Sequence, residues 1–123
     1  MVDFKVLIVD DDFINRRLLI EILKKELYSV DTIESINGED ALNQLRIDPD
    51  IQLVLLDMEM PKLSGIEFLR YYINDDTISR IPIIAFSSND EWKREALIVG
   101  ADAFLTKPIT EKKLMEAILY SSE

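Results

Sequence analysis

Short apolar runs alternate along this chain with longer stretches in which apolar residues recur every three or four positions. Each run has the length of a buried strand, and the longer stretches have the period of an amphipathic helix. The predicted strands cover residues 4–9, 28–34, 51–56, 82–86 and 101–105, and the second of them is the most polar. The repeated alternation of strand-like runs with helix-like stretches predicts an α/β domain.

The predicted helices fill the intervals between these strands. In the first, Ile14, Leu18 and Ile22 form one stripe and Asp12 is a suitable N-cap. The predicted helices cover residues 13–27, 38 to about 47, a stretch from about 65, 90–100 with Gly100 as the closing glycine, and the segment that Thr110 caps. Five strand–helix units predict a doubly wound, mostly parallel sheet with helices on both faces.

Polar side chains follow four of the predicted strands directly. Asp57 ends the apolar run 51–56, and the first run leads into the acids 10–12. Ser87 follows the fourth run, and Lys107 comes just after the fifth. Because open α/β sheets bind ligands at the carboxyl ends of their strands, these groups are expected to share one pocket.

An acidic pocket of this kind needs neutralisation. Two carboxylates about 4 Å apart repel by roughly 4 kcal/mol at an effective dielectric constant near 20. A proton shared between two acids, a hard divalent cation and a nearby lysine are the available remedies. Taken one at a time, the acids also fit a helix start, Ser87 a loop cap and Lys107 a surface cation.

Composition limits the class of protein. The 123 residues, 48% of them hydrophobic, suit one domain, which we expect to span 1–123. A net charge of −10 argues against binding to nucleic acid or to an anionic membrane surface. The chain contains neither cysteine nor histidine, so it has no thiol nucleophile and no phosphohistidine of its own. Without a long apolar run or a signal-peptide pattern, it is expected to be cytoplasmic and not inserted in a membrane.

Four separated motifs resemble one family in the same order. They are Val9-Asp10-Asp11, Leu56-Asp57-Met58-Glu59-Met60-Pro61 with Gly65, Phe86-Ser87, and Phe104-Leu105-Thr106-Lys107-Pro108. Over nearly its whole length the chain resembles the receiver domain of two-component response regulators. The resemblance implies the flavodoxin-like strand order 2-1-3-4-5, and a cis peptide bond between Lys107 and Pro108.

The resemblance also implies a role for each motif. Asp57 would accept a phosphoryl group from the phosphohistidine of a histidine kinase or a histidine phosphotransfer protein. Mg²⁺ would be held by Asp11 directly, by Asp10 largely through water, by Asp57, and by the backbone carbonyl of Glu59. The implied cation beside the phosphoryl group is Lys107, and the implied switch residues are Ser87 and Phe104.

Departures from the family pattern are small. Ser87 stands where threonine is frequent and keeps the hydroxyl, whereas Phe104 stands where tyrosine is frequent and has no phenolic oxygen. Ser88 is slightly larger than the usual alanine. Glu59 and Asn89 are expected to flank the path of the hydrolytic water, where Glu59 adds a charge.

Two surfaces are candidates for partners. In the family a phosphotransfer partner docks beside the site on the first helix, where Ile14 and Leu18 lie, although Leu18 is predicted to belong to the core. Ile98 with Met115 and Leu119 is a candidate apolar surface on the side of the last strand and the two last helices. Such a surface suits a phosphorylation-dependent partner or a homodimer, while Trp92 is predicted to pack.

Other classes explain the sequence less well. The favoured class is a self-modifying switch that is not an enzyme for an external substrate, free-standing or excised from a hybrid histidine kinase. An aspartyl-phosphate phosphohydrolase requires an Asp-x-Asp pattern, but Glu59 occupies the second position. A flavodoxin-like cofactor binder requires a glycine- and hydroxyl-rich phosphate loop, but the first strand leads into three aspartates.

Overall fold

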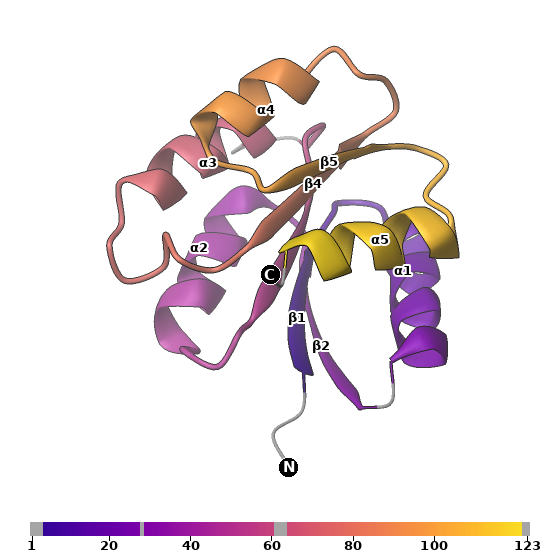
Figure 1. The fold of residues 1–123 in the computed structure, drawn as a ribbon. Coiled ribbons are helices and arrows are strands. Elements are labelled where there is room, and N and C mark those ends of the chain that lie inside the picture. Colours follow the sequence, from indigo (N-terminus) through magenta and orange to yellow (C-terminus); the bar gives the residue numbers. More distant parts are fainter. Residues whose placement is uncertain (1–3, 28, 61–63, 122–123) are drawn as a thin grey trace.

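A single five-stranded parallel sheet organises the domain, with helices packed on both of its faces (Figure 1). The computed structural model describes residues 4–27, 29–60 and 64–121. The strands are β1 (Phe4–Val9), β2 (Val30–Ser35), β3 (Leu53–Asp57), β4 (Ile83–Ser87) and β5 (Ala103–Thr106). The helices are α1 (Phe13–Glu26), α2 (Gly38–Ile47), α3 (Gly65–Ile73), α4 (Lys93–Val99) and α5 (Glu111–Ser121).

The strand order is β2-β1-β3-β4-β5, and all neighbouring strands run parallel. This confirms the predicted doubly wound fold and the order 2-1-3-4-5. The chain reverses its direction of winding after β2, so β1 and β3 meet at the centre of the sheet. Ligand sites of open α/β sheets lie at this switch point, beyond the carboxyl ends of the strands.

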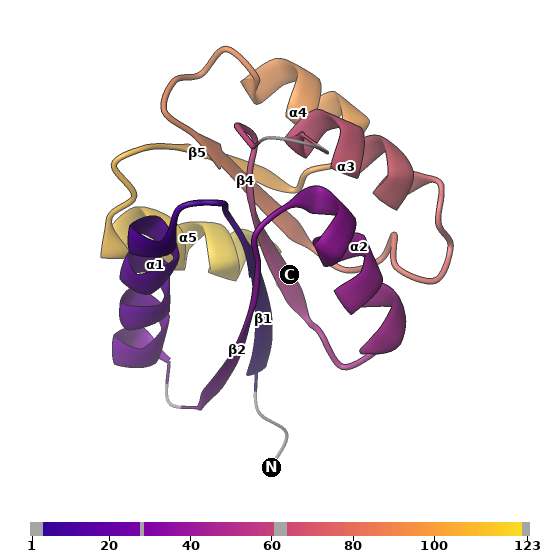
Figure 2. The same cartoon turned by 180° about the vertical axis from the view of Figure 1, so that it is seen from behind.

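Two hydrophobic cores lie on opposite sides of the sheet. Helices α1 and α5 cover one face, and α2, α3 and α4 cover the other (Figures 1 and 2). Side chains alternate along β1, so Val6 and Ile8 pack toward α1 and α5, while Leu7 and Val9 pack toward the other three helices. Because both faces are covered, β3 and β4 are apolar up to their last residues, Asp57 and Ser87.

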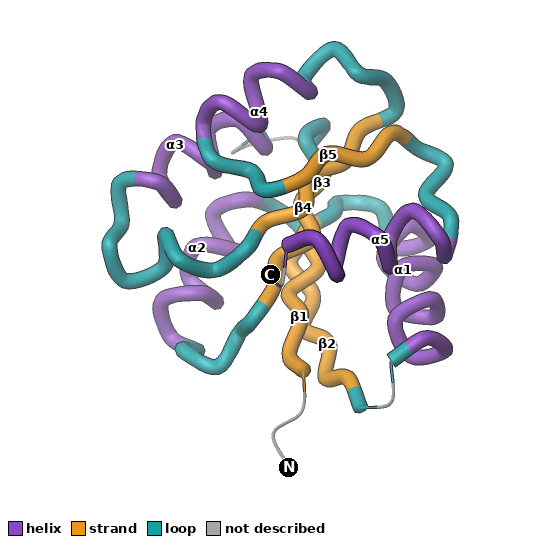
Figure 3. Tube along the Cα trace, viewed as in Figure 1, coloured by secondary structure: helices purple, strands orange, loops and turns teal. Residues whose placement is uncertain are grey.

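Several element boundaries differ from those predicted. Helix α4 begins at Lys93, because residues 88–92 form a loop in which the Asn89 side chain accepts a hydrogen bond from the Glu91 backbone N–H over 2.9 Å (Figure 3). Gly100, at φ 142°, closes that helix as predicted. Strands β2, β3 and β5 each begin two residues later than predicted. Tyr28 lies outside the described residues.

The prediction that Leu18 belongs to the core is wrong. Its side chain is 55% exposed, because the buried residues of α1 are Arg16, Leu19, Ile20 and Leu23. Ile14 is also exposed on this helix, as is Ile98 on α4, where solvent exposure was predicted. Trp92 is partly buried and packs against the core on the α2–α4 side, which confirms its predicted packing role.

Candidate functional site

Register places the polar residues of four strands at one edge of the sheet. Val9 pairs with Leu56, so Asp10 and Asp57 follow at the same level. Asp57 pairs with Phe86, and Ser87 pairs with Thr106. Ser87 and Lys107 therefore stand next to one another, as the 2.8 Å hydrogen bond from the Lys107 backbone N–H to the Ser87 carbonyl confirms.

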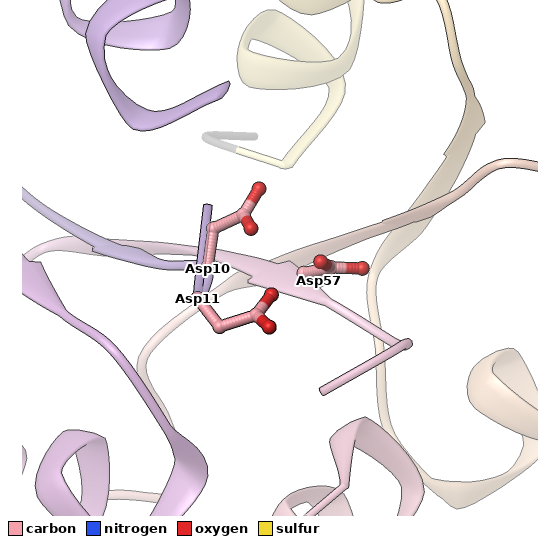
Figure 4. Close-up of side chains that lie close together, drawn as sticks. All are labelled: Asp10, Asp11 and Asp57. Atoms are coloured by element: carbon pink, nitrogen blue, oxygen red, sulfur yellow. The ribbon is translucent and has the colours of Figure 1, made fainter. Parts of the chain in front are cut away.

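Three carboxyl groups gather at this edge, as Figure 4 shows. Each of Asp10, Asp11 and Asp57 offers an oxygen, and these oxygens all lie within 4.8 Å of one another. Asp10 and Asp57 are almost completely buried, while Asp11 is exposed. The predicted convergence of acids from the ends of the first and third strands is thus found in the fold.

Only one of the two carboxylate oxygens of Asp10 accepts a hydrogen bond within the described residues. Its Oδ1 accepts a hydrogen bond from the Asp12 backbone N–H over 2.9 Å, but its Oδ2 is buried with no partner among the described residues. Burial raises the pKa of Asp10 above its usual value. A buried carboxylate oxygen without a donor suits a hard cation with oxygen ligands, so this donor set fits Mg²⁺.

A buried arginine supports the backbone beneath this carboxylate. Arg16 Nη1 donates to the Asp10 carbonyl over 2.8 Å, and Arg16 Nε donates to Glu34 over 2.9 Å. The guanidinium also lies 5.8 Å from the centre of the Phe13 ring. The strand-end loop that holds the acids is thereby tied to β2. Sequence reasoning missed Arg16, since an arginine in a predicted helix gives no sign of burial.

Asp57 lies at the centre of the site, where two influences oppose each other. Its burial is the main cause that raises its pKa to about 7, and the neighbouring Asp10 adds to this effect. The hydrogen bond of 2.9 Å from the Glu59 backbone N–H and the charge of Lys107 act in the other direction. Lys107 Nζ lies 3.8 Å from Asp57 Oδ2, close enough for an ion pair.

Glu59 binds the hydroxyl that was predicted to act as a switch. Its Oε1 accepts hydrogen bonds from Ser87 Oγ at 2.5 Å, from the Ser88 backbone N–H at 2.8 Å and from Ser88 Oγ at 2.8 Å. The bond from Ser87 is the main cause that lowers the pKa of Glu59 to about 2. Nothing in the local sequence signals this contact, because the partners are 28 or 29 residues apart.

Lys107 and Phe104 complete the predicted set. The Lys107–Pro108 peptide bond is cis, as the family resemblance implied. The Lys107 ammonium group also lies 5.5 Å from the centre of the Phe86 ring. Phe104 is half-buried and packs against the core on the α2–α4 side, so the structure holds it neither fully in nor fully out. The motif residue Pro61 lies outside the described residues.

A cleft of about 420 Å³ opens beside the acids, between α1 and the segment that follows β5. It is lined by Asn15, Leu18, Leu19, Ile22, Phe86, Ser88, Lys107, Pro108 and Ile109. Of the apolar α1 residues that line it, Leu18 is exposed, Ile22 is half-buried and Leu19 is buried.

Ile98 on α4 and Leu119 on α5 are exposed, and Met115 on α5 is half-buried. No helix in the described part of the chain is long and apolar enough to cross a bilayer.

Comparison with known proteins agrees with this arrangement. Residues 6–119 match the model of the response regulator receiver domain family. The chain is 32% identical over 117 residues to the chemotaxis protein CheY of Treponema pallidum, an alignment that covers 94% of this chain and 80% of that protein.

Solved structures share the fold. Vibrio cholerae CheY4 is 26% identical, covers 98% of this chain and 99% of its own, and superposes with a TM-score of 0.83. The receiver domain of the Pseudomonas aeruginosa sensor histidine kinase PA1611, solved with a magnesium ion in its active-site cleft, is 22% identical with a TM-score of 0.87, over 99% of this chain and 100% of that one.

This chain belongs to the response regulator receiver domain family of two-component signalling systems. It has the CheY-like fold, and receiver domains interact with histidine kinases or phosphotransfer proteins.

Proposed function

We propose that residues 1–123 act as one phosphoacceptor domain in which Asp57 takes a phosphoryl group from the phosphohistidine of a partner. The observation that carries the proposal is the position of Asp57, a residue that is 2% exposed and whose carboxylate lies between the acids Asp10 and Asp11 and the ammonium group of Lys107. A nucleophile flanked by metal-binding acids and by a fixed cation matches the requirements of phosphoryl transfer.

In the proposed step a carboxylate oxygen of Asp57 attacks the phosphorus of the partner's phosphohistidine. The new O–P bond forms as the N–P bond breaks, and the electron pair of that bond stays on the imidazole nitrogen, which then takes a proton. The product is an acyl phosphate on Asp57 and a free histidine on the partner. These 123 residues contain no histidine, so the phosphoryl donor lies outside them.

Mg²⁺ is the proposed cofactor, and the unpartnered Asp10 Oδ2 supports a cation here. The carboxylates of Asp10, Asp11 and Asp57 and the backbone carbonyl of Glu59 would hold it. When bound, Mg²⁺ supplies positive charge that offsets the repulsion between acids and phosphoryl oxygens. The magnesium ion in the receiver domain of PA1611 supports the same choice of metal.

The protein's own cation and hydroxyl do the remaining work. Lys107 is already 3.8 Å from Asp57 and would pair with a phosphoryl oxygen, while Ser87 would donate its hydroxyl to another. Movement of Ser87 would shift the end of β4. Because β4 pairs with β5, this shift would reach Phe104, which is half-buried on β5. We infer that this path alters the α4–β5–α5 surface that contains the exposed Ile98 and Leu119.

Two surfaces of the domain are the proposed binding sites for its partners. The cleft between α1 and the segment after β5 opens beside Asp57 and would receive the phosphorylated helix of a histidine kinase or phosphotransfer protein in the cytoplasm. The α4–β5–α5 surface would receive a phosphorylation-dependent partner or a second copy of the chain. The domain would turn over no external substrate, because the phosphoryl group ends on its own Asp57.

The test is incubation of the protein with Mg²⁺ and acetyl phosphate, followed by intact mass measurement. One added phosphoryl group is expected in the native protein and none in Asp57→Asn, which conserves side-chain volume and removes the nucleophile. Asp76→Asn is the matched control, because Asp76 is an exposed acid on the loop between α3 and β4. An adduct that persists in Asp57→Asn, or none in the native chain, would overturn the proposal.

A further inference from the structure

The carboxylate of Glu59 accepts hydrogen bonds from Ser87 and Ser88. The Ser87 hydroxyl is the group proposed above to donate to a phosphoryl oxygen on Asp57. It reaches from the loop after β3 to the end of β4 and accepts hydrogen bonds from Ser87 Oγ, the Ser88 backbone N–H and Ser88 Oγ at 2.5, 2.8 and 2.8 Å. All three bonds end on the same oxygen, Oε1. Glu59 itself is exposed, whereas Ser87 is completely buried.

These donors cannot serve two acceptors equally well. A serine hydroxyl and a backbone N–H each carry one hydrogen, so the proton that Ser87 gives to Glu59 is withheld from any other oxygen. A phosphoryl group on Asp57 would bring about −1.5 to −2 charges and strong acceptor oxygens to the same place. Glu59 and a phosphoryl group would therefore compete for the same donors. They would also repel each other, because both are negatively charged.

Glu59 is also tied to the nucleophile itself. Its backbone N–H donates to Asp57 Oδ1 over 2.9 Å, while its side chain binds Ser87 and Ser88. One residue thus connects the position that becomes modified with the hydroxyl that responds. A change at Asp57 acts on the backbone of the residue whose side chain holds the responding hydroxyl.

We propose that Glu59 is an internal latch: in the unmodified domain its carboxylate holds Ser87 and Ser88, and a phosphoryl group must displace it before the switch responds. The inference rests on the proposed function of Asp57 and assigns to the Glu59 side chain a role separate from the metal contact proposed for its backbone carbonyl. The latch lowers the affinity of the site for a phosphoryl group and favours the inactive arrangement.

The first measurement tests the contact in the free protein, without metal or phosphodonor. A hydrogen bond from a backbone N–H to a carboxylate displaces that amide proton downfield, and the Ser88 amide is the reporter. Glu59→Gln keeps the shape of the side chain and removes its charge. We expect the Ser88 amide proton to move upfield in this variant, whereas Glu91→Gln, a neutralised acid on the next loop whose side chain makes no bond within the described residues, leaves it unmoved.

The second measurement tests competition. At saturating Mg²⁺, beryllofluoride serves as a small mimic of the phosphoryl group, and binding is followed by NMR. In Glu59→Gln the hydrogen bonds from Ser87 and Ser88 no longer end on a charged acceptor, so these donors are easier to release. From the usual strength of charged hydrogen bonds, we expect the variant to bind beryllofluoride about tenfold more tightly. Glu91→Gln is expected to bind as the native protein does.

A double variant separates the latch from a simple charge effect. In the Ser87→Ala background the latch has lost its buried donor, so the gain from Glu59→Gln is expected to shrink several-fold. An undiminished gain would mean that only the charge of Glu59 matters, and equal or weaker binding in Glu59→Gln would mean that no latch exists. If the native protein fails to bind beryllofluoride, or if Asp57→Asn binds it, the proposed function itself is wrong. The latch proposal is then wrong as well, because it rests on that function.

Discussion

Arg16, a residue that is only 9% exposed, donates a 2.8 Å hydrogen bond from its Nη1 to the backbone carbonyl of Asp10. The carbonyl belongs to the residue whose carboxylate lies in the acidic site, and no other side chain is seen to bind it among the described residues. Arg16 therefore links the stability of the fold with the placement of the acids.

Replacing Arg16 by alanine should destabilise the domain and weaken its metal site together. The buried Asp10 carbonyl would lose its donor, which typically costs about 1–3 kcal/mol. Urea unfolding at pH 7 gives the stability and Mg²⁺ titration gives the affinity. The neighbouring exposed Arg17→Ala is the control and should change neither. Equal effects of the two substitutions would contradict the role of Arg16.

Asp57 should make the metal-free domain less stable as the pH rises. Its pKa of about 7 in the folded state lies above the usual 3.8, so the folded state keeps a proton that the unfolded chain has released. This stabilisation is complete below about pH 4 and is lost as the pH rises through about 7. The sign is that of a raised pKa, because the folded state binds more protons than the unfolded state in this interval.

Asp57→Asn removes this pH dependence and should be the more stable protein above pH 7. Each pKa unit is worth about 1.4 kcal/mol, so the advantage is a few kcal/mol at most. Urea unfolding in EDTA between pH 4 and pH 8 should show the two stability curves diverging as the pH rises. Parallel curves would mean that Asp57 has an ordinary pKa in the fold.

Asp11→Asn should weaken Mg²⁺ binding without unfolding the domain. Asp11 is exposed, so its carboxylate contributes little to the core, yet its oxygen lies within 4.8 Å of those of Asp10 and Asp57. Removal of one charged ligand is expected to lower Mg²⁺ affinity about tenfold or more and to slow phosphorylation by acetyl phosphate. An unchanged Mg²⁺ affinity, measured by calorimetry beside Asp76→Asn, would exclude Asp11 from the metal shell.

Gly65→Ala should destabilise the protein through the loop that leads from Asp57. A Cβ atom at position 65 would lie 2.5 Å from Met58 Cα and 3.0 Å from the Asp57 carbonyl oxygen, contacts that require the backbone to move. We expect a loss of about 2 kcal/mol or more and slower phosphorylation. Thermal unfolding tests the first effect, and a melting temperature equal to that of the native protein would show that the loop adapts freely.

Ser87→Ala should separate phosphorylation from the response to it. The variant keeps Asp57 and its neighbours, so acetyl phosphate should still modify it. A complete shift of a two-state equilibrium from 1:99 to 99:1 needs about 5.5 kcal/mol, more than one hydrogen bond supplies, so Lys107 and Phe104 must act with Ser87. NMR shifts caused by beryllofluoride at Phe104 and Ile98 should shrink in the variant. Equal shifts would exclude Ser87 as the coupling residue.

The residues of the candidate site could be predicted from the sequence because they stand at strand ends. Apolar runs show where a parallel sheet ends, and Asp57, Ser87 and Lys107 follow such runs directly. The alternation of elements likewise determined the fold class, since strand and helix periods differ. Local periodicity was less able to assign exposure, and Leu18 lies outside the buried face of α1 although its spacing suits a core stripe.

Tertiary structure alone decided which distant groups touch. Arg16 binds the Asp10 carbonyl across the first turn of α1, and Glu59, in the loop after β3, binds Ser87 at the end of β4. The start of α4 was set locally instead, by the hydrogen bond from the Glu91 backbone N–H to the Asn89 side chain, which the apolar period did not reveal. The sequence by itself determined the order of elements and the residues at the strand ends, because period and polarity are local properties. Contacts between separate elements depend on sheet register and helix packing, which bring together residues that no local pattern relates.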